Sequence, residues 1–370
     1  MIFVNPASEK SSYIGALDFW KFLFSIIIVF YHGGLSFHTD TYQIFSNGAL
    51  AVDFFFLVSG YLMAVSVSKM EDRELSTGKD TLSFLWRKIR AFLPYYLVAF
   101  FFAFISWGIF SFDLSSSFLK NATAAIGCLQ NFLLLDMTGI HTTSVMGLTW
   151  YLSAMLLAMA IIYPLFRKYR ETYLYLIAPF SCLLLAGYMC QTYGALTPYN
   201  EFGVLVFHGM ARAVLELNLG CFVFLVSRLL SQINLTKLSR VLLTIFEWGF
   251  YFVVIAYLYT GKRSDVFTVL FLLFFALTIS TSHQSAVSFL FDNRVCKFLG
   301  KFSLVLYLSQ TATRRMIASL LPDQPWYIPF CIYVIATILL ALLSMGIVSF
   351  TRHFWKKYGT HLSGLLISHK

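Results

Sequence analysis

Three ionisable residues stand inside the first long apolar run of the sequence, LDFWKFLFSIIIVFYHGG: Asp18, Lys21 and His32. An ionisable side chain within a membrane span costs at least about 2.5 kcal/mol, so it normally faces the interior of the bundle and has a function there. Histidine takes and returns a proton near neutral pH, which makes it the usual general base. We therefore expect His32 to deprotonate an acceptor hydroxyl in a cavity. A hydrogen-bonded histidine of the core is the alternative.

The spacing of Lys21 and His32 places them on one face of a helix. His32 follows Lys21 by 11 positions, which turn the helix about 20° past three full turns and rise about 16 Å along its axis. Asp18 stands one turn before Lys21, near the same face. For Asp18 and Lys21, an i,i+3 ion pair at the helix end is the alternative to a catalytic role.

A second candidate site is the basic segment Arg87-Lys88-Ile89-Arg90, which directly precedes Phe92-Leu93-Pro94. Arginine forks suit phosphate oxygens, and Arg87 and Arg90 are one helical turn apart. Together with Lys88 they predict a clamp for the phosphates of a nucleotide-type carrier such as coenzyme A at the cytoplasmic face. The alternative is a positive cluster that only orients the chain in the membrane.

Two further apolar runs contain ionisable residues. The second run, GALAVDFFFLVSGYLMA, places Asp53 at a depth similar to that of His32 on an antiparallel neighbour. We expect Asp18 or Asp53 to fix the orientation or the charge of His32; for Asp53, a carboxylate without a partner at the outer membrane surface is the alternative. Arg212 and Glu216 are four residues apart and predict a structural ion pair.

The composition indicates the environment of these residues. Of 370 residues, 59% are hydrophobic and 12% are charged, whereas soluble domains carry about 25% charged residues. We therefore predict an all-α membrane bundle, with one domain over residues 1–370 and no soluble domain. The net charge of +10 lies in loops between apolar runs, so it does not indicate nucleic-acid binding. The six cysteines form no CxxC pair and predict neither a disulfide frame nor a metal site.

Ten segments have the roughly 20 apolar residues that a spanning helix needs. They lie at about 16–36, 47–68, 88–111, 147–167, 172–191, 204–229, 239–260, 265–282, 298–320 and 327–350. With a cytoplasmic N-terminus, 20 of the 27 lysines and arginines lie inside and five outside. We therefore predict ten helices with both termini in the cytoplasm, in the inner or plasma membrane. One outer connection is long, and its stretch 121–135 is too short to cross.

These segments resemble the motifs of the acyltransferase-3 family, membrane acyltransferases that acylate carbohydrates of bacterial envelopes and capsules. The first run resembles the family's opening motif, with Lys21 and then His32. GALAVDFFFLVSGYLMA resembles its second-helix signature, and RKIRAFLPYY resembles its RxxR-x-x-x-Pro motif. Weaker similarities are TWYLSA at 149–154, the spacing of Arg212, Glu216 and Gly220, and KFSLVLYLSQ at 301–310.

The resemblance implies a ten-helix core, an acyl-coenzyme A donor bound from the cytoplasm and an acceptor on the outer side. It makes His32 the catalytic residue and gives Arg87 and Arg90 a donor-binding or structural role. The sequence departs from the family pattern at three positions: Lys21 replaces a frequent arginine, Met155 a frequent glutamate and Gln310 a frequent histidine.

The favoured function is transfer of a short acyl group, acetyl or succinyl, onto a sugar hydroxyl of an envelope, capsular or exopolysaccharide glycan or a lipid-linked sugar. We prefer direct transfer over an acyl-histidine intermediate. The alternative is a proton-coupled transporter or an exporter of a lipid-linked sugar. Transporters often have two pseudo-symmetric halves, whereas here the ionisable residues concentrate in the first three spans. A non-catalytic scaffold poorly explains Lys21 and His32 on one face.

Overall fold

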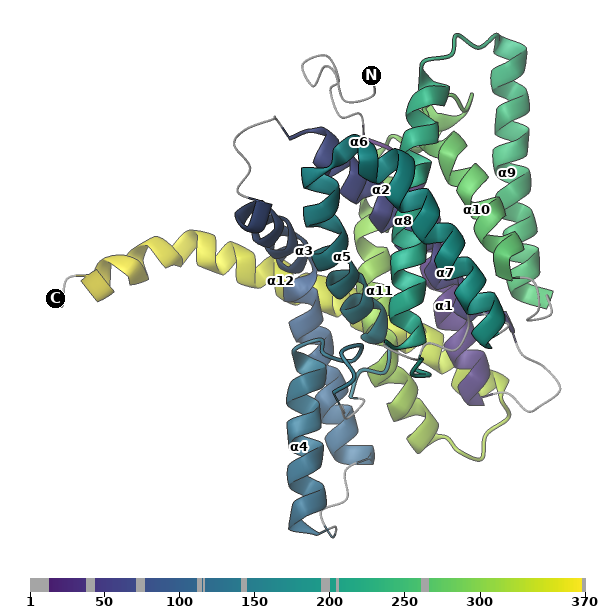
Figure 1. Cartoon of the computed structure of the whole chain (residues 1–370). Coiled ribbons are helices and arrows are strands. Elements are labelled where there is room, and N and C mark those ends of the chain that lie inside the picture. Colours follow the sequence, from purple (N-terminus) through teal and green to yellow (C-terminus); the bar gives the residue numbers. More distant parts are fainter. Residues whose placement is uncertain are drawn as a thin grey trace.

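The computed structural model describes residues 13–37, 44–70, 77–111, 115, 117–140, 145–193, 200–203, 206–260 and 266–367. Within these ranges the chain forms a bundle of helices with no β-sheet (Figure 1). The physical reason is that a backbone inside a bilayer must satisfy its hydrogen bonds within each segment. The predicted all-α membrane bundle is confirmed.

Each predicted span coincides with a helix, and the span at 172–191 coincides with the continuous run α6, η2 and α7. The helices are α1 (Gly15–Phe37), η1 (Gly48–Leu50), α2 (Ala51–Ser68), α3 (Thr77–Phe110), α4 (Phe118–Phe132), α5 (Trp150–Lys168), α6 (Arg170–Thr172), η2 (Tyr173–Ile177), α7 (Ala178–Tyr193), α8 (His208–Ser231), α9 (Lys237–Thr260), α10 (Val266–Thr281), η3 (Ser288–Phe291), α11 (Arg294–Leu320) and α12 (Tyr327–Ile367).

Among the described residues, eight helical segments are long and apolar enough to cross a membrane. Neither α10, which is apolar but shorter, nor α11 is one of them. Helix α11 contains buried polar side chains, among them Ser309, Gln310 and Thr313. It packs against α1, α3 and α12, so most of its surface faces protein instead of lipid. This position explains why α11 is less apolar than its neighbours.

Close contacts between helices bring the ionisable residues together. Helix α1 packs most extensively against α11, and α2 against α8. At the α2–α8 crossing, Gly60 lies against the backbone of Leu217 and Gly220 against the backbone of Leu57, where a Cβ on either glycine would collide with a carbonyl oxygen. Small residues allow such close approach of membrane helices. The crossing fixes the height of Asp53 on α2 relative to α8.

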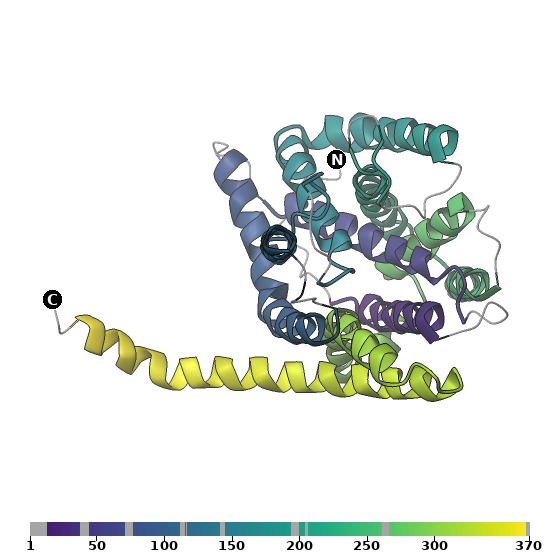
Figure 2. The ribbon, with the colours of Figure 1, turned by 90° about the horizontal axis from the view of Figure 1, so that it is seen from below.

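Two parts of the chain extend beyond the central bundle. Helix α4 contains most of the stretch 121–135, and α4 and the C-terminal half of α3 extend past the other helices at the lower side of Figure 1. Tyr96 of α3 donates to the carbonyl oxygens of Asn131 and Phe132 at the end of α4, at 3.0 and 3.1 Å. Helix α12 runs along the outside of the bundle and projects past it (Figure 2).

Candidate active site

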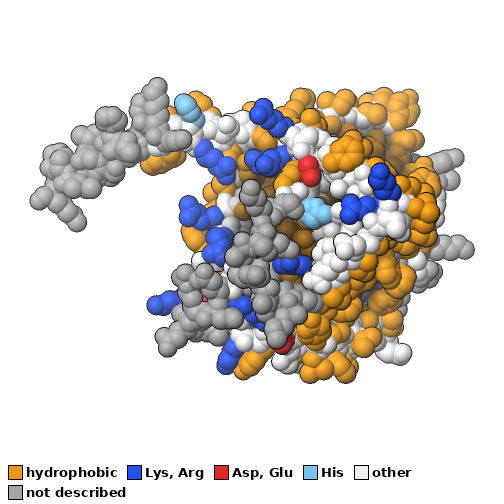
Figure 3. Space-filling view, turned by 90° about the horizontal axis from the view of Figure 1, so that it is seen from above, with side chains coloured by type: hydrophobic (Ala, Val, Ile, Leu, Met, Phe, Trp, Pro, Cys, Tyr) orange, Lys and Arg blue, Asp and Glu red, His pale blue; other side chains and the backbone are white. Residues whose placement is uncertain are grey.

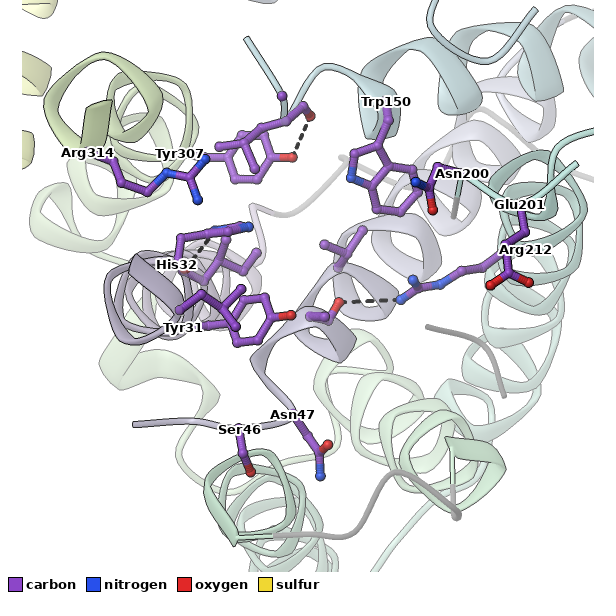
Figure 4. A pocket seen from close by; sticks show the side chains of 16 residues that line it. Tyr31, His32, Ser46, Asn47, Trp150, Asn200, Glu201, Arg212, Tyr307 and Arg314 are labelled. Carbon is purple, nitrogen blue, oxygen red and sulfur yellow. Dashed lines mark hydrogen bonds between the residues drawn. The ribbon is translucent and has the colours of Figure 1, made fainter. Parts of the chain in front are cut away.

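A cavity of about 500 Å³ lies between α1, α5, α8 and α11, next to η1 and α2. Aromatic, amide and hydroxyl side chains line it together with four ionisable residues (Figure 4). Such a mixed lining is typical of a site for a small ligand. The lining residues are Ile28, Tyr31, His32, Leu35, Ser46, Asn47, Ala49, Val52, Gly147, Leu148, Trp150, Asn200, Glu201, Arg212, Tyr307 and Arg314.

His32 has a defined tautomer. Its Nδ1 lies 3.0 Å from the carbonyl oxygen of Ile28 and 3.2 Å from Oε1 of Gln310. The Gln310 amide is oriented by its Nε2, which donates to the carbonyl oxygen of Tyr307 at 2.9 Å. Both partners of Nδ1 are therefore acceptors, and this assigns the ring proton to Nδ1. Nε2 keeps a free lone pair, as a general base requires, and Figure 4 shows the ring directed into the cavity.

Gln310, and neither Asp18 nor Asp53, orients His32, so the expectation of an orienting carboxylate is wrong. Asp18 stands 14 residues before His32, about 21 Å away along α1. Asp53 is bonded to Arg212 of α8 instead. Depth along a helix does not determine which neighbouring side chain a carboxylate meets.

Asp18 and Lys21 form an ion pair at the start of α1. Lys21 Nζ donates to Oδ1 of Asp18 at 3.0 Å, and the Tyr13 hydroxyl donates to Oδ2 at 2.9 Å. Burial and the hydrogen bond to Asp18 raise the pKa of Tyr13. The side chain of Asp18 fits against α11 because Gly300 has no side chain there. Lys21 is close enough to Lys88 of α3 for their like charges to interact. Lys21 therefore lies near the basic segment of α3.

The basic segment lies within α3, which begins at Thr77, 11 residues before the predicted span. Arg87 and Arg90 are exposed, whereas Lys88 is half-buried with its Nζ 5.9 Å from the ring centre of Phe84. Arg87 donates to Ser83 at 2.8 Å, one turn earlier on the same helix. Both guanidinium groups are accessible to a phosphate. Lysine and arginine side chains gather on the face of the molecule seen in Figure 3.

The predicted pair of Arg212 and Glu216 is confirmed, with 2.9 Å between Nε and Oε1. Asp53 joins it through Nη2 of Arg212, so all three form one buried ion cluster between α2 and α8. The guanidinium also lies 5.6 Å from the ring centre of Trp150. Two carboxyl groups on one guanidinium leave a formal charge of −1 unless the carboxyls share a proton. The cluster forms one wall of the cavity through Arg212.

Other residues of the site were not predicted as site residues. Tyr307 and Arg314, which line the cavity, precede and follow Gln310 on α11 by three and four residues, so they share a helix face with the amide that contacts His32. Trp150, from the TWYLSA motif, lines the opposite side. Their i−3 and i+4 spacing from Gln310 is the sequence signal from which Tyr307 and Arg314 could have been predicted as site residues.

A family model described as an acyltransferase domain, Acyl_transf_3, matches residues 14–347. The match includes the cavity, the basic segment of α3 and the α2–α8 ion cluster. The chain belongs to the acyltransferase-3 family. No curated protein and no solved structure matches it.

This membrane acyltransferase therefore has its candidate base, His32, in a polar cavity at one end of α1. Lys88, from the basic segment of α3, lies near Lys21 at the other end of α1. Membership in an enzyme family decides between the two functions that the residues left open, and the transporter is set aside. Within the described residues, no group of three or more His, Cys, Asp or Glu side chains is arranged to hold a metal ion.

Proposed function

We propose that this protein transfers an acetyl or other short acyl group from cytoplasmic acyl-coenzyme A to a hydroxyl of an envelope, capsular or exopolysaccharide sugar. The observation that carries the proposal is the hydrogen bonding of His32. Its Nδ1 faces two acceptors, and its Nε2 is left to take a proton from a ligand in the cavity.

The chemistry at His32 is proton transfer coupled to acyl transfer. Nε2 takes the proton of the acceptor hydroxyl while that oxygen attacks the thioester carbonyl carbon. The C–S bond then breaks, and the leaving thiolate takes the proton back from His32. General-base catalysis of this kind contributes about 10²–10⁴-fold to a rate. Direct transfer needs one histidine and forms no acyl-enzyme intermediate.

The donor would bind with its phosphates on Arg87 and Arg90, supported by Lys88 and Lys21. Arginine pairs bind phosphate oxygens through two parallel hydrogen bonds. The acyl arm would then extend along α1 toward His32. The lining of the cavity on α1 begins at Ile28, seven residues and about 10 Å after Lys21. The acyl arm of the donor has to extend over this distance to reach the cavity.

The distribution of basic residues supports an orientation with the start of α1 in the cytoplasm. With the start of α1 in the cytoplasm, the donor clamp faces the cell interior and the cavity lies in the outer half of the bilayer. Tyr31, Trp150, Asn47 and Asn200 give the cavity aromatic faces and amide groups. These side chains suit the apolar faces and hydroxyls of a sugar.

Acetyl-coenzyme A binding and release of free coenzyme A by the purified protein test the proposal. We expect His32→Ala to bind acetyl-coenzyme A with an affinity close to that of the wild type, and to lower the turnover number at least 100-fold. Arg90→Ala should raise the dissociation constant of the donor. Turnover by His32→Ala at the rate of the wild type would exclude His32 as the base. A wild-type protein that binds no acetyl-coenzyme A would exclude the donor.

A further inference from the structure

Arg314 is a cavity residue to which the proposed reaction has so far given no role. It lies on α11 one turn after Gln310, so it faces α1 from the same side as the amide that orients His32. Figure 4 shows its guanidinium over the same end of the cavity as the His32 ring. His32 and Arg314 are close enough for their charges to interact.

Three neighbouring arginines differ in how their charge is balanced. Arg212 is paired with two carboxyl groups. Arg315 donates to the carbonyl oxygens of Ala103 and Val145, both at 3.0 Å, and ties α11 to the chain around it. Arg314 is half-buried and contacts the Ser36 hydroxyl at 3.5 Å, a long hydrogen bond to a neutral group.

In the part of the chain that the structure describes, no carboxylate lies within ion-pair distance of Arg314. Arg314 lines the cavity, and Glu201, which also lines it, lies on the Arg212 side in Figure 4. A charge that is partly removed from water acts more strongly than one in water. An anion that forms beside His32 would lie close to this charge.

Acyl transfer from a thioester forms such an anion. When the acceptor oxygen bonds to the carbonyl carbon, the π electrons of the carbonyl move to its oxygen; they return when the C–S bond breaks. Enzymes stabilise this oxyanion with fixed donors, and the loss of one donor typically lowers kcat about 10²–10³-fold. A guanidinium presents several N–H donors in a rigid plane.

We propose that Arg314 stabilises the oxyanion of the tetrahedral intermediate while His32 holds the proton of the acceptor. The inference rests on the proposed acyl transfer and gives it a second catalytic residue. Arg314 and His32 then act on two different atoms, the carbonyl oxygen and the attacking hydroxyl. The first bears the developing negative charge, and the second loses its proton.

The test measures the release of coenzyme A from acetyl-coenzyme A by the purified protein with water as the acceptor, which requires the same oxyanion. We expect Arg314→Gln to lower kcat about 100-fold or more, with the KM for acetyl-coenzyme A within about threefold of the wild type. Arg314→Lys keeps the charge without the planar fork and should lose about tenfold. The exposed Arg240 provides a matched control, and Arg240→Gln should behave as the wild type.

Wild-type kcat in Arg314→Gln overturns the inference, and so does a rise of KM with an unchanged kcat, which indicates binding alone. If Arg314→Gln does not fold, the kinetics of Arg314→Lys test the inference instead. A lower kcat at constant KM supports the role of Arg314 in stabilising the oxyanion, and an unchanged kcat contradicts it. If the wild type binds acetyl-coenzyme A but releases no coenzyme A with either water or an added glycan as the acceptor, the proposed function fails and this inference fails with it. If the wild type is active and both Arg314 variants match it, only the inference fails.

Discussion

At the scale of single residues, Gln310 determines what His32 can do. Gln310→Leu removes one of the two acceptors of the Nδ1 proton and leaves the Ile28 carbonyl. We expect kcat to fall about tenfold with little change in the KM for acetyl-coenzyme A, because the base remains but its ring is less well held. Steady-state kinetics of coenzyme A release measure both parameters.

Gln310→Glu is the conservative variant for this role. A carboxylate accepts the Nδ1 proton as the amide oxygen does but cannot donate to the Tyr307 carbonyl as Nε2 does, so we expect it to recover part of the activity lost in Gln310→Leu. Equal losses in Gln310→Leu and Gln310→Glu would show that the residue serves packing and not orientation.

The α2–α8 ion cluster gives a prediction about stability. Arg212→Met leaves the Asp53 and Glu216 carboxyls buried with no cation, and we expect it to destabilise the fold by about 3–5 kcal/mol. Thermal unfolding in detergent, followed by size-exclusion chromatography, detects this loss. Glu171 is exposed, so Glu171→Gln serves as the control and should leave the unfolding temperature unchanged. An Arg212→Met protein as stable as the wild type would contradict the account of the cluster.

At the scale of helices, the contact at Gly60 makes the α2–α8 crossing intolerant of any side chain. Gly60→Ala places a methyl group against the carbonyl of Leu217, and the resulting overpacking should cost about 1–3 kcal/mol. Gly187 of α7 has open space where its Cβ would lie, so Gly187→Ala should be neutral or stabilising. Unfolding temperatures of the two variants test the difference. Equal effects would show that α2 and α8 are not in backbone contact.

Much of this arrangement could be predicted from the sequence, because apolar runs of sufficient length must become helices in a bilayer. The i,i+3 and i,i+4 pairs, Asp18 with Lys21 and Arg212 with Glu216, follow from spacing within one helix. Contacts between helices do not follow from spacing. The partners of His32 and Asp53 depend on how α1 meets α11 and how α2 meets α8, which the sequence of each helix leaves open.

At the scale of the whole molecule, the two proposed functions, donor binding and acyl transfer, lie at opposite ends of α1. Lys88, which stands between the exposed Arg87 and Arg90 in the sequence of α3, lies near Lys21 at the start of α1, and the cavity lies at the other end of α1. In the proposed orientation the donor is bound at the cytoplasmic face, and the acyl group is transferred in the outer half of the membrane. A helix with Lys21 at one end and His32 at the other connects the two sites, which are about 16 Å apart along its axis.

Sealed native membrane vesicles supplied with radiolabelled acetyl-coenzyme A on one face test this central claim most directly. The account predicts that label reaches the glycan fraction when the donor is on the cytoplasmic face, is absent when the donor is on the outer face, and is absent from vesicles with His32→Asn. Labelling from the outer face, or undiminished labelling with His32→Asn, would contradict it.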